Sequence, residues 1–308
     1  MSPEALTGQR ILLTGVTGQV AGPLARNLVA AGNTVYGTSR FADPESRAKV
    51  EADGVVPVAI DLETASLDEV PDGLDYVIHM AVSKEKEFDR ALAANAEGVA
   101  FLVEKVKGVK AFFHCSSCAV YEPNGHQAHL ETDALGDNHR AMGFLDTYSI
   151  SKIAAESAVK YAARRFDVPA VIARLDVPYG PTHGWPSIML MMAQHGMATP
   201  VHPDAPNTHN FLHDDDILTS LPYLLAEADT SVPIFNWCSP EIVSIEEWTV
   251  ELTRLTGVEI PLETTTASIP PNPIDPSKLL GLGWSPSVTW KDGFQRLVST
   301  AYPDLYKG

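Results

Sequence analysis

The sequence predicts an α/β fold, with a doubly wound parallel sheet and a smaller C-terminal lobe. Short apolar runs alternate with longer amphipathic stretches, and the first run leads directly into a glycine-containing turn. The chain has 308 residues, 45% of them hydrophobic, which is enough to bury a large core. Because parallel neighbouring strands need crossover connections, strands that alternate with helices favour a parallel sheet.

Each predicted strand is a brief β-branched or aromatic run bounded by turn residues. The strands are expected at 11–14, 34–38, 55–60, 76–80, 111–115 and 170–173. Apolar residues at helical spacing predict helices between them, at about 18–31, 85–107 and 147–166.

The composition changes after Arg174, where prolines and glycines become dense and a Met-rich stretch follows at 188–192. Further helices are predicted at about 214–226, 244–256 and 290–300. We expect residues 1–175, with a returning segment near 208–237, to form a dinucleotide-binding Rossmann domain. Residues 176–207 and 238–308 would form the substrate-binding lobe, which is too irregular for a second sheet and would cover the carboxyl ends of the strands.

The charge balance is acidic, with 39 Asp and Glu against 22 Lys and Arg and a formal net charge of −17. Such a surface repels phosphate backbones, so nucleic acid and anionic membranes are not expected as partners. An anionic ligand would need a locally positive pocket. The chain begins without a basic region followed by an apolar stretch, and a cytoplasmic location is expected.

The chain contains three cysteines, Cys115, Cys118 and Cys238. The first two have CxxC spacing, which is compatible with a redox or zinc site. Cys115 ends an apolar run, however, and no second CxxC completes a metal site. We therefore expect structural cysteines and no metal, and the odd count suits a reducing compartment.

A phosphate-binding turn is predicted at residues 14–21, Thr-Gly-Val-Thr-Gly-Gln-Val-Ala. Gly15 permits the tight turn, Gly18 lets the backbone approach a pyrophosphate, and the small Ala21 allows close packing of helix on strand. The phosphates would lie on N–H groups at the helix N-terminus. The predicted cofactor-binding residues here are Gly15, Thr17, Gly18, Gln19 and Val20.

The end of the second strand distinguishes NAD from NADP. An acidic residue there would hold the ribose 2′-hydroxyl, but this chain has Ser39-Arg40. A guanidinium can pair with a 2′-phosphate, so NADP is preferred and NAD stays possible. Asp61 and Leu62 follow the third strand, where Asp61 could accept from the adenine amino group or cap the turn.

Tyr148 and Lys152 are four residues apart in Asp-Thr-Tyr-Ser-Ile-Ser-Lys at 146–152, so they project from one face of a helix. A tyrosine phenol has a pKa of about 10, too high for proton transfer at neutral pH. A nearby ammonium and an oxidised nicotinamide would lower that pKa toward the working range. A surface Tyr–Lys pair without function is the alternative.

A serine at the carboxyl end of the fifth strand completes the predicted catalytic site. Ligands of such sheets bind in the crevice at that end, and a hydroxyl there can orient a substrate oxygen. We favour Ser117 over Ser116, and a serine that only caps the turn is the alternative.

The sequence resembles the extended short-chain dehydrogenases/reductases of the NAD-dependent epimerase/dehydratase family over nearly its whole length. The resemblance is carried by residues 14–21, 77–81, 95–98, Ser-Ser-x-x-Val-Tyr at 116–121, Tyr148 with Lys152, Tyr179-Gly180-Pro181, 211–213 before Asp215-Asp216, and Leu282-Gly283-Trp284 with Pro286. It implies Ser117 as substrate orienter, Tyr148 as acid–base and Lys152 as its partner. It also implies that Met80, Ala81 and Ser83 line the nicotinamide side, and that His79 and Asn95 hold the local structure.

Two departures concern the substrate. Val177 stands where sugar-nucleotide members usually have asparagine, and His209 stands where they often have arginine. Both changes remove donors for a diphosphate. The Met-rich stretch with Trp185 could line a pocket, although methionine more often fills a core.

Three functions remain open. The favoured one is an NAD(P)(H)-dependent oxidoreductase that interconverts a ketone or aldehyde with an alcohol through a Ser-Tyr-Lys site. The alternatives are a sugar-nucleotide epimerase or dehydratase with tightly bound NAD(P), and a nucleotide-sensing regulator, which the tyrosine and lysine disfavour. A homodimer is expected through the helices at 85–107 and 147–166, with the Ala-rich residues 91–96 allowing close approach.

Overall fold

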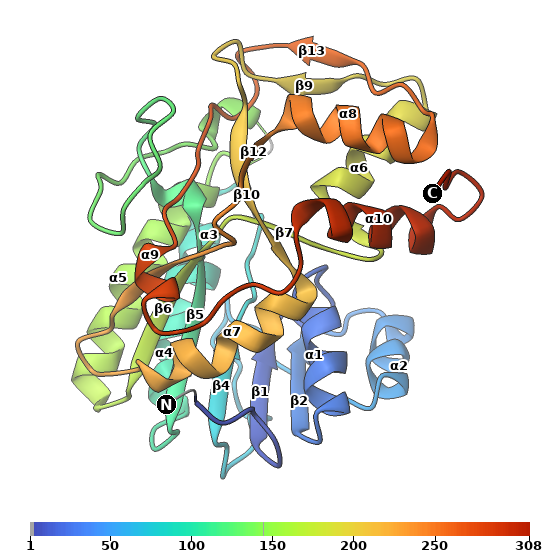
Figure 1. The fold of residues 1–308 in the computed structure, drawn as a ribbon. Helices are drawn as coiled ribbons and strands as arrows, with labels where there is room; N and C mark the ends of the chain where they lie inside the picture. The colour runs from blue at the N-terminus through green and yellow to red at the C-terminus, as the bar shows by residue number, and fades with distance from the viewer. Residues whose placement is uncertain (1–2, 144) are drawn as a thin grey trace.

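The computed structural model describes residues 3–143 and 145–308. Its centre is a seven-stranded sheet in the order β11-β6-β5-β4-β1-β2-β3, in which all neighbours are parallel (Figure 1). The strands are β1 (Arg10–Thr14), β2 (Thr34–Ser39), β3 (Val56–Ala59), β4 (Tyr76–His79), β5 (Ala111–Ser117), β6 (Ala170–Leu175) and β11 (Ile234–Trp237). The six predicted strands are confirmed, and β11 was not predicted as one.

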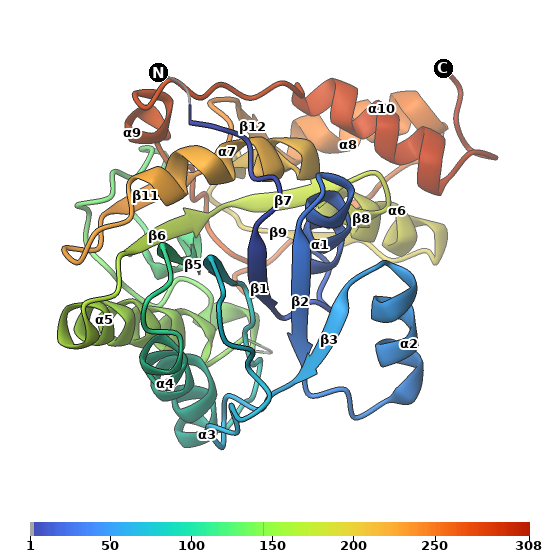
Figure 2. The same cartoon turned by 90° about the horizontal axis from the view of Figure 1, so that it is seen from below.

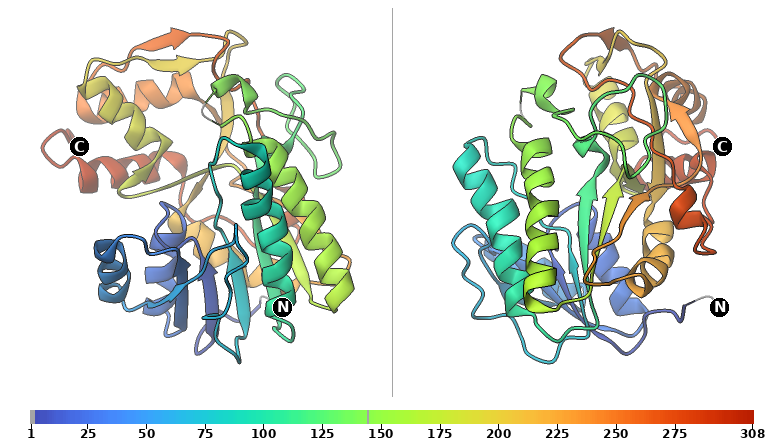
Figure 3. Two further views of the ribbon diagram at one scale, coloured as in Figure 1. Left: turned by 180° about the vertical axis from the view of Figure 1, so that it is seen from behind. Right: turned by 90° about the vertical axis from the view of Figure 1, so that its left-hand side faces the viewer.

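Helices cover both faces of this sheet. Helices α4 (Gly98–Lys105) and α5 (Tyr148–Phe166) lie side by side on one face, while α1 (Ala21–Ala30) and α7 (Asp214–Ala226) pack on the other (Figures 2 and 3). Successive residues of β1 point to opposite faces, so Ile11 and Leu13 join the α1–α7 core and Leu12 joins the α4–α5 core. Helix α2 (Pro44–Ala52), which was not predicted, packs beside β3.

The predicted helix at 85–107 is interrupted. It consists of α3 (Phe88–Leu92), a π-helical turn (Ala93–Glu97) and α4. Ala91, Ala94 and Ala96 are buried within the chain, where this segment packs on α5. The expectation that these alanines allow close approach to a second subunit is therefore wrong, because their own chain already covers them.

The C-terminal half contains strands, contrary to expectation. A four-stranded sheet has the order β12 (Ile242–Ser244), β10 (Thr208–His213), β7 (Val177–Gly180) and β8 (His183–Gly184), and β13 (Leu262–Thr264) pairs with β9 (Thr199–Val201). Apart from β10, these strands have four residues or fewer, and β7 and β9 contain proline, so they give little signal in the sequence. Helices α6 (Trp185–Gln194), α8 (Ile245–Thr256), α9 (Ser277–Leu280) and α10 (Trp290–Ala301) complete the chain, with 3₁₀ turns at Cys118–Val120 and Arg140–Met142.

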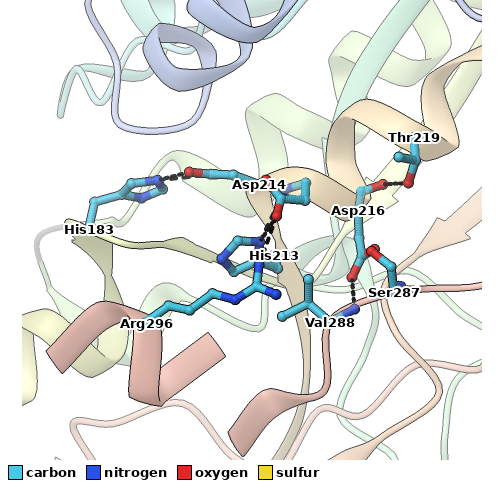
Figure 4. A network of polar contacts seen from close by, with 9 residues as sticks. His183, His213, Asp214, Asp216, Thr219, Ser287, Val288 and Arg296 are labelled. Atoms are coloured by element: carbon cyan, nitrogen blue, oxygen red, sulfur yellow. Dashed lines mark hydrogen bonds and ion pairs between the residues drawn. The ribbon is translucent and has the colours of Figure 1, made fainter. Parts of the chain in front are cut away.

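A polar network joins the start of α7 to the C-terminal segment (Figure 4). The Asp216 carboxylate accepts hydrogen bonds from the backbone N–H (2.7 Å) and hydroxyl (2.8 Å) of Ser287. The Arg296 guanidinium donates to Asp215 at 2.9 Å. This network fixes α7, which packs on the central sheet, against the segment that leads into α10.

The proposed division at residue 175 stays a prediction. Within the described residues, no helix is both long and apolar enough to span a bilayer.

Candidate active site

A cavity of about 1050 Å³ lies where β1, β2, β3, β4 and β5 end. Ligands of doubly wound sheets bind at this edge. The lining includes these predicted site residues: Gly15, Thr17, Gly18, Gln19, Val20, Ser39, Arg40, Asp61, Leu62, Met80, Ala81, Ser83, Ser117 and Tyr148. Lys152 is not among the lining residues. The cavity therefore brings together residues from the loops after β1, β2, β3 and β4, from the end of β5 and from the start of α5.

Gly15 lets the glycine turn pack closely against the loop after β4. Gly15 has a φ of +75°, and a Cβ there would lie 2.8 Å from the Cα atom of Ala81. The Gly18 N–H donates to the Gly15 carbonyl at 2.8 Å, which closes the turn. Helix α1 has no side-chain N-cap and no acidic residue in its first turn, so nothing there competes with a bound anion. These features fit the diphosphate of NAD or NADP.

The far end of the cavity carries charges of both signs. Arg40 and Glu63 both line it, and the Arg90 guanidinium holds Glu63 with bonds of 2.7 and 3.2 Å. Arg90 lowers the pKa of the Glu63 carboxyl, with a smaller contribution from Arg40. Asp61 accepts from the backbone N–H of Glu63 at 2.9 Å, so it caps the turn, as one of its two predicted roles requires.

Thr14 shapes the loop after β4. Its hydroxyl accepts the backbone N–H groups of Met80 and Ala81, each at 3.0 Å, and lies 2.8 Å from Nδ1 of His79. Burial, followed by the effect of the Lys152 ammonium, lowers the pKa of His79 to about 3. His79 is therefore a neutral structural histidine at physiological pH.

Asn95 ties the same loop to α5. Its side chain accepts from the Ser83 N–H at 2.7 Å and donates to the Ser83 carbonyl at 2.9 Å and to the Ser151 hydroxyl at 3.1 Å. Asn95 lies in the π-helical turn, a deviation frequently found at functional sites.

Tyr148 is the first residue of α5 and lines the cavity beside Ser117. Burial raises the pKa of its phenol above the usual value, and the neighbouring Ser117 hydroxyl opposes this only in part. Lys152 lies one turn later and is buried, and its ammonium donates to the carbonyl oxygen of Cys115 at 2.7 Å. The predicted lowering of the Tyr148 pKa by Lys152 is therefore not found in the protein alone.

The two candidate serines face different surroundings. The Ser116 hydroxyl is buried and donates to Glu156 at 2.6 Å, and Glu156 also accepts two bonds from Arg174, at 2.9 and 2.8 Å. Ser117 lines the cavity, and its oxygen accepts from the Ala119 N–H at 3.2 Å. The geometry thus favours Ser117 over Ser116 as a group that touches a ligand, while the turn-capping role also applies to it.

His139 also lines the cavity and was not predicted. Its ring centroid lies 5.5 Å from that of Tyr148. The only sequence signal is that His139 precedes the Tyr–Lys helix, within a loop of no recognisable pattern.

The three cysteines are buried and form no disulfide. Burial raises the pKa of the Cys115 thiol to about 11, and the Cys118 thiol, whose pKa is also raised, donates to Asp176 at 3.2 Å. Burial and the raised pKa values disfavour the reactive thiolate form at neutral pH.

Val177 and His209, the two departures from the usual pattern of sugar-nucleotide members, do not line the cavity. Val177 and His209 are buried in β7 and β10, and His209 packs edge-on against Trp185 with centroids 5.3 Å apart. Within the Met-rich stretch, Met189 is buried in the lobe core, whereas Ile188 lines the cavity.

The model of the NAD dependent epimerase/dehydratase family matches residues 11–238. A dTDP-D-glucose 4,6-dehydratase of Homo sapiens is 26% identical over 246 residues, which cover 73% of this chain and 68% of that protein. A trifunctional UDP-glucose 4,6-dehydratase/UDP-4-keto-6-deoxy-D-glucose 3,5-epimerase/UDP-4-keto-L-rhamnose-reductase of Arabidopsis thaliana is 24% identical over 249 residues, 74% of this chain and 36% of that protein. This chain spans about a third of the length of such plant relatives.

Solved structures share the fold. UDP-glucuronic acid 4-epimerase from Bacillus cereus, in complex with UDP-glucuronic acid and NAD, has a TM-score of 0.79 at 20% identity and covers 96% of this chain and 100% of its own. A dTDP-glucose 4,6-dehydratase from Streptomyces venezuelae, with NAD bound, has a TM-score of 0.78 at 21% identity and covers 97% and 99%. The predicted doubly wound Rossmann fold is confirmed.

Proposed function

Because the chain belongs to the NAD dependent epimerase/dehydratase family, an extended type of short-chain dehydrogenase/reductase, we propose that it transforms the sugar of a nucleotide sugar with NAD or NADP. This is the second of the functions that the sequence left open. It replaces the simple carbonyl reductase as the favoured one, since the relatives are named for reactions on UDP- and dTDP-sugars.

The observation that carries the proposal is the common cavity of the glycine turn, Ser117 and Tyr148. A nicotinamide bound there would accept or donate the hydride. Ser117 would hold the substrate oxygen, and the Tyr148 phenol would take or give the proton at that oxygen. Lys152 would hold its position through Cys115 and favour the phenolate.

The cavity offers the positive charge that an acidic protein needs for anionic ligands. Arg40, Lys84 and Lys86 all line it, and none forms an ion pair with another described residue. We propose that Arg40 binds the adenosine end and favours NADP over NAD, while the two lysines attract the diphosphate of cofactor or substrate.

A specific observation keeps the carbonyl–alcohol oxidoreductase as a second candidate. Val177 and His209 replace the usual diphosphate donors and do not line the cavity. An uncharged ketone or secondary alcohol would not need those donors.

We also propose a homodimer through α4 and α5, which lie side by side on one face. Phe101 and Tyr161 are 49% and 65% exposed on these helices, so they could pack against a second copy. Light scattering tests this, and a monomer mass would reject it.

The functional test incubates the protein with NAD⁺ or NADP⁺ and either UDP-glucose, dTDP-glucose or cyclohexanol. Products are separated by chromatography, and the reduced-nicotinamide absorbance is followed. Conversion of a nucleotide sugar that Tyr148→Phe abolishes supports the proposal. Turnover of cyclohexanol alone supports the second candidate and overturns the first.

A further inference from the structure

His139 differs from all other cavity-lining residues in the described part of the chain. Its Nδ1 atom is buried and has no hydrogen-bond partner, whereas no other lining residue carries such an atom. Leaving a buried polar group unpaired costs about 1–3 kcal/mol. The atom has almost no accessible surface as the ring is placed, but the residue lines the cavity, so a turn of the ring about χ2 would bring the nitrogen to a ligand that supplies the partner.

The position of His139 is fixed by its backbone. Its N–H donates to the Ser149 hydroxyl at 3.2 Å, and its carbonyl accepts from Met142 at 3.1 Å, closing the 3₁₀ turn. Ser149 is the neighbour of Tyr148 on α5, so the loop and the phenol are anchored to the same helix. The two rings consequently lie 5.5 Å apart at an angle of 39°.

The surroundings keep the imidazole neutral. Burial lowers the pKa of His139 to about 4, the nearby His209 lowers it further, and Asp176 opposes this effect. Asp176 is itself engaged, because it accepts from the Cys118 thiol and from the Asn210 N–H at 2.8 Å. A neutral imidazole has one donor and one acceptor, which matches a hydroxyl group and does not match the charge of a phosphate.

We propose that His139 is a specificity-determining residue that hydrogen-bonds a sugar hydroxyl beside the carbon on which Tyr148 acts. This inference rests on the proposed function, and it names the group that binds beside Tyr148 and His139, a polyhydroxylated ring. The contact by His139 thereby favours a ligand that carries the sugar over the nucleotide alone. Its loop, not the positions of Val177 and His209, then provides the polar recognition in this chain.

The test compares the wild type with two variants of His139 and one control. His139→Phe keeps a planar ring without polar atoms, and His139→Gln supplies an amide donor and acceptor. The control His195→Gln changes an exposed histidine at the C-terminal end of α6. Calorimetry measures the binding of NAD⁺, and then the binding of UDP-glucose and of UDP with NAD⁺ saturating. We expect His139→Phe to weaken UDP-glucose binding by about tenfold or more, the effect of one lost hydrogen bond. NAD⁺ and UDP binding should change by less than about twofold, and His139→Gln should recover part of the loss.

A second readout separates recognition from structure. His139→Phe removes an unpaired polar atom, so its thermal unfolding midpoint should equal or exceed that of the wild type. A clear drop in midpoint together with equal loss of UDP and UDP-glucose binding would overturn the proposal. Unchanged UDP-glucose binding in His139→Phe would overturn it as well, with the proposed function intact.

Failure of the proposed function has its own signature. If wild type converts neither UDP-glucose nor dTDP-glucose, the nucleotide-sugar function fails, and the variants are compared with cyclohexane-1,2-diol, which carries a hydroxyl beside the reacting one, as substrate. A KM raised about tenfold in His139→Phe alone would then support a hydroxyl contact by His139. An unchanged KM would overturn it, and a wild type that uses none of these compounds would overturn function and inference together.

Discussion

The Lys152 ammonium donates a 2.7 Å hydrogen bond to the carbonyl oxygen of Cys115, at the end of the strand that also carries Ser117. The helix that presents Tyr148 is thereby joined to the strand that presents the serine. Lys152 is buried, and burial lowers the pKa of its ammonium. The contact sets the spacing of the predicted site without placing Lys152 in the cavity lining.

Replacing Lys152 tests this contact. We expect Lys152→Met to reduce kcat by about 10²- to 10⁴-fold, because the ammonium would favour the ionised phenol together with a bound nicotinamide, although the protein alone shows no such effect. The optimum of the pH–rate profile should move upward. The exposed Lys105→Met on α4 is the control, and a Lys152→Met enzyme with the wild-type pH profile would contradict the assigned role.

Mutation of the two serines should have different effects, mainly on catalysis for Ser117 and mainly on stability for Ser116. Ser117→Ala removes the hydroxyl that lines the cavity, so kcat/KM should fall about 10- to 100-fold, and the lost cap on the Ala119 N–H should cost about 1 kcal/mol of unfolding free energy. Ser116→Ala removes a donor to the buried Glu156–Arg174 pair and should cost about 1–3 kcal/mol of unfolding free energy instead. Steady-state kinetics and urea unfolding of both variants check this. Equal kinetic losses would refute the choice of Ser117.

Arg40 should control cofactor choice. Arg40→Gln is expected to weaken NADP⁺ binding by about 10- to 100-fold, since a charge-assisted hydrogen bond to a 2′-phosphate contributes about 1.5–3 kcal/mol. NAD⁺ binding should stay nearly constant. Arg47→Gln, which changes an exposed arginine paired with Glu51, is the matched control. A parallel loss for both cofactors would mean that Arg40 binds a group that the two share.

Acid stability should depend on a stacked histidine pair on β4 and β5, two interior strands of the central sheet. The ring centroids of His79 and His114 lie 5.3 Å apart, and neither ring nitrogen of His114 has a hydrogen-bond partner. Burial lowers the pKa of both histidines, that of His79 from 6.5 to about 3. The folded state thus keeps them neutral, whereas the unfolded chain binds protons below pH 6.5. Stability is complete above that pH and falls as the pH drops toward 3, by up to about 1.4 kcal/mol per pH unit for each histidine.

His114→Phe should therefore make the decline of unfolding free energy between pH 6.5 and 4 shallower, as measured by urea titrations followed by circular dichroism. The exposed His195→Gln should leave the slope unchanged. An identical slope in His114→Phe would show that His114 is protonated in the folded state.

Local patterns in the sequence account for most of the central fold. Strands such as β5 are buried along their whole length, so their apolar runs stand out. Strand β11 was missed although it is no shorter than β3 and β4; it contains the polar Asn236, and its pairing with β6 joins chain segments about sixty residues apart. The C-terminal strands were missed for the same reason, since short strands are defined by their partners.

Some features of the candidate site follow from local motifs in the sequence, whereas others depend on distant residues. The glycine turn and the Tyr148–Lys152 spacing are local motifs, and the structure brings the turn and Tyr148 to one cavity. Which of two adjacent serines faces the ligand depends on the distant Glu156 and Arg174. The unpaired nitrogen of His139 is a tertiary property that no spacing in the sequence encodes.

We propose above all that the Tyr148 phenol and a nicotinamide on the glycine turn occupy one site. Its most direct test is an ultraviolet difference titration of tyrosine ionisation, with and without saturating NAD⁺, in the wild type and in Tyr148→Phe. Burial raises the Tyr148 pKa in the free protein, and the positive nicotinamide ring should lower it, so NAD⁺ should add one titrating phenol below pH 10 that the variant lacks. If saturating NAD⁺ changed neither titration, or changed both equally, Tyr148 would not lie beside the nicotinamide.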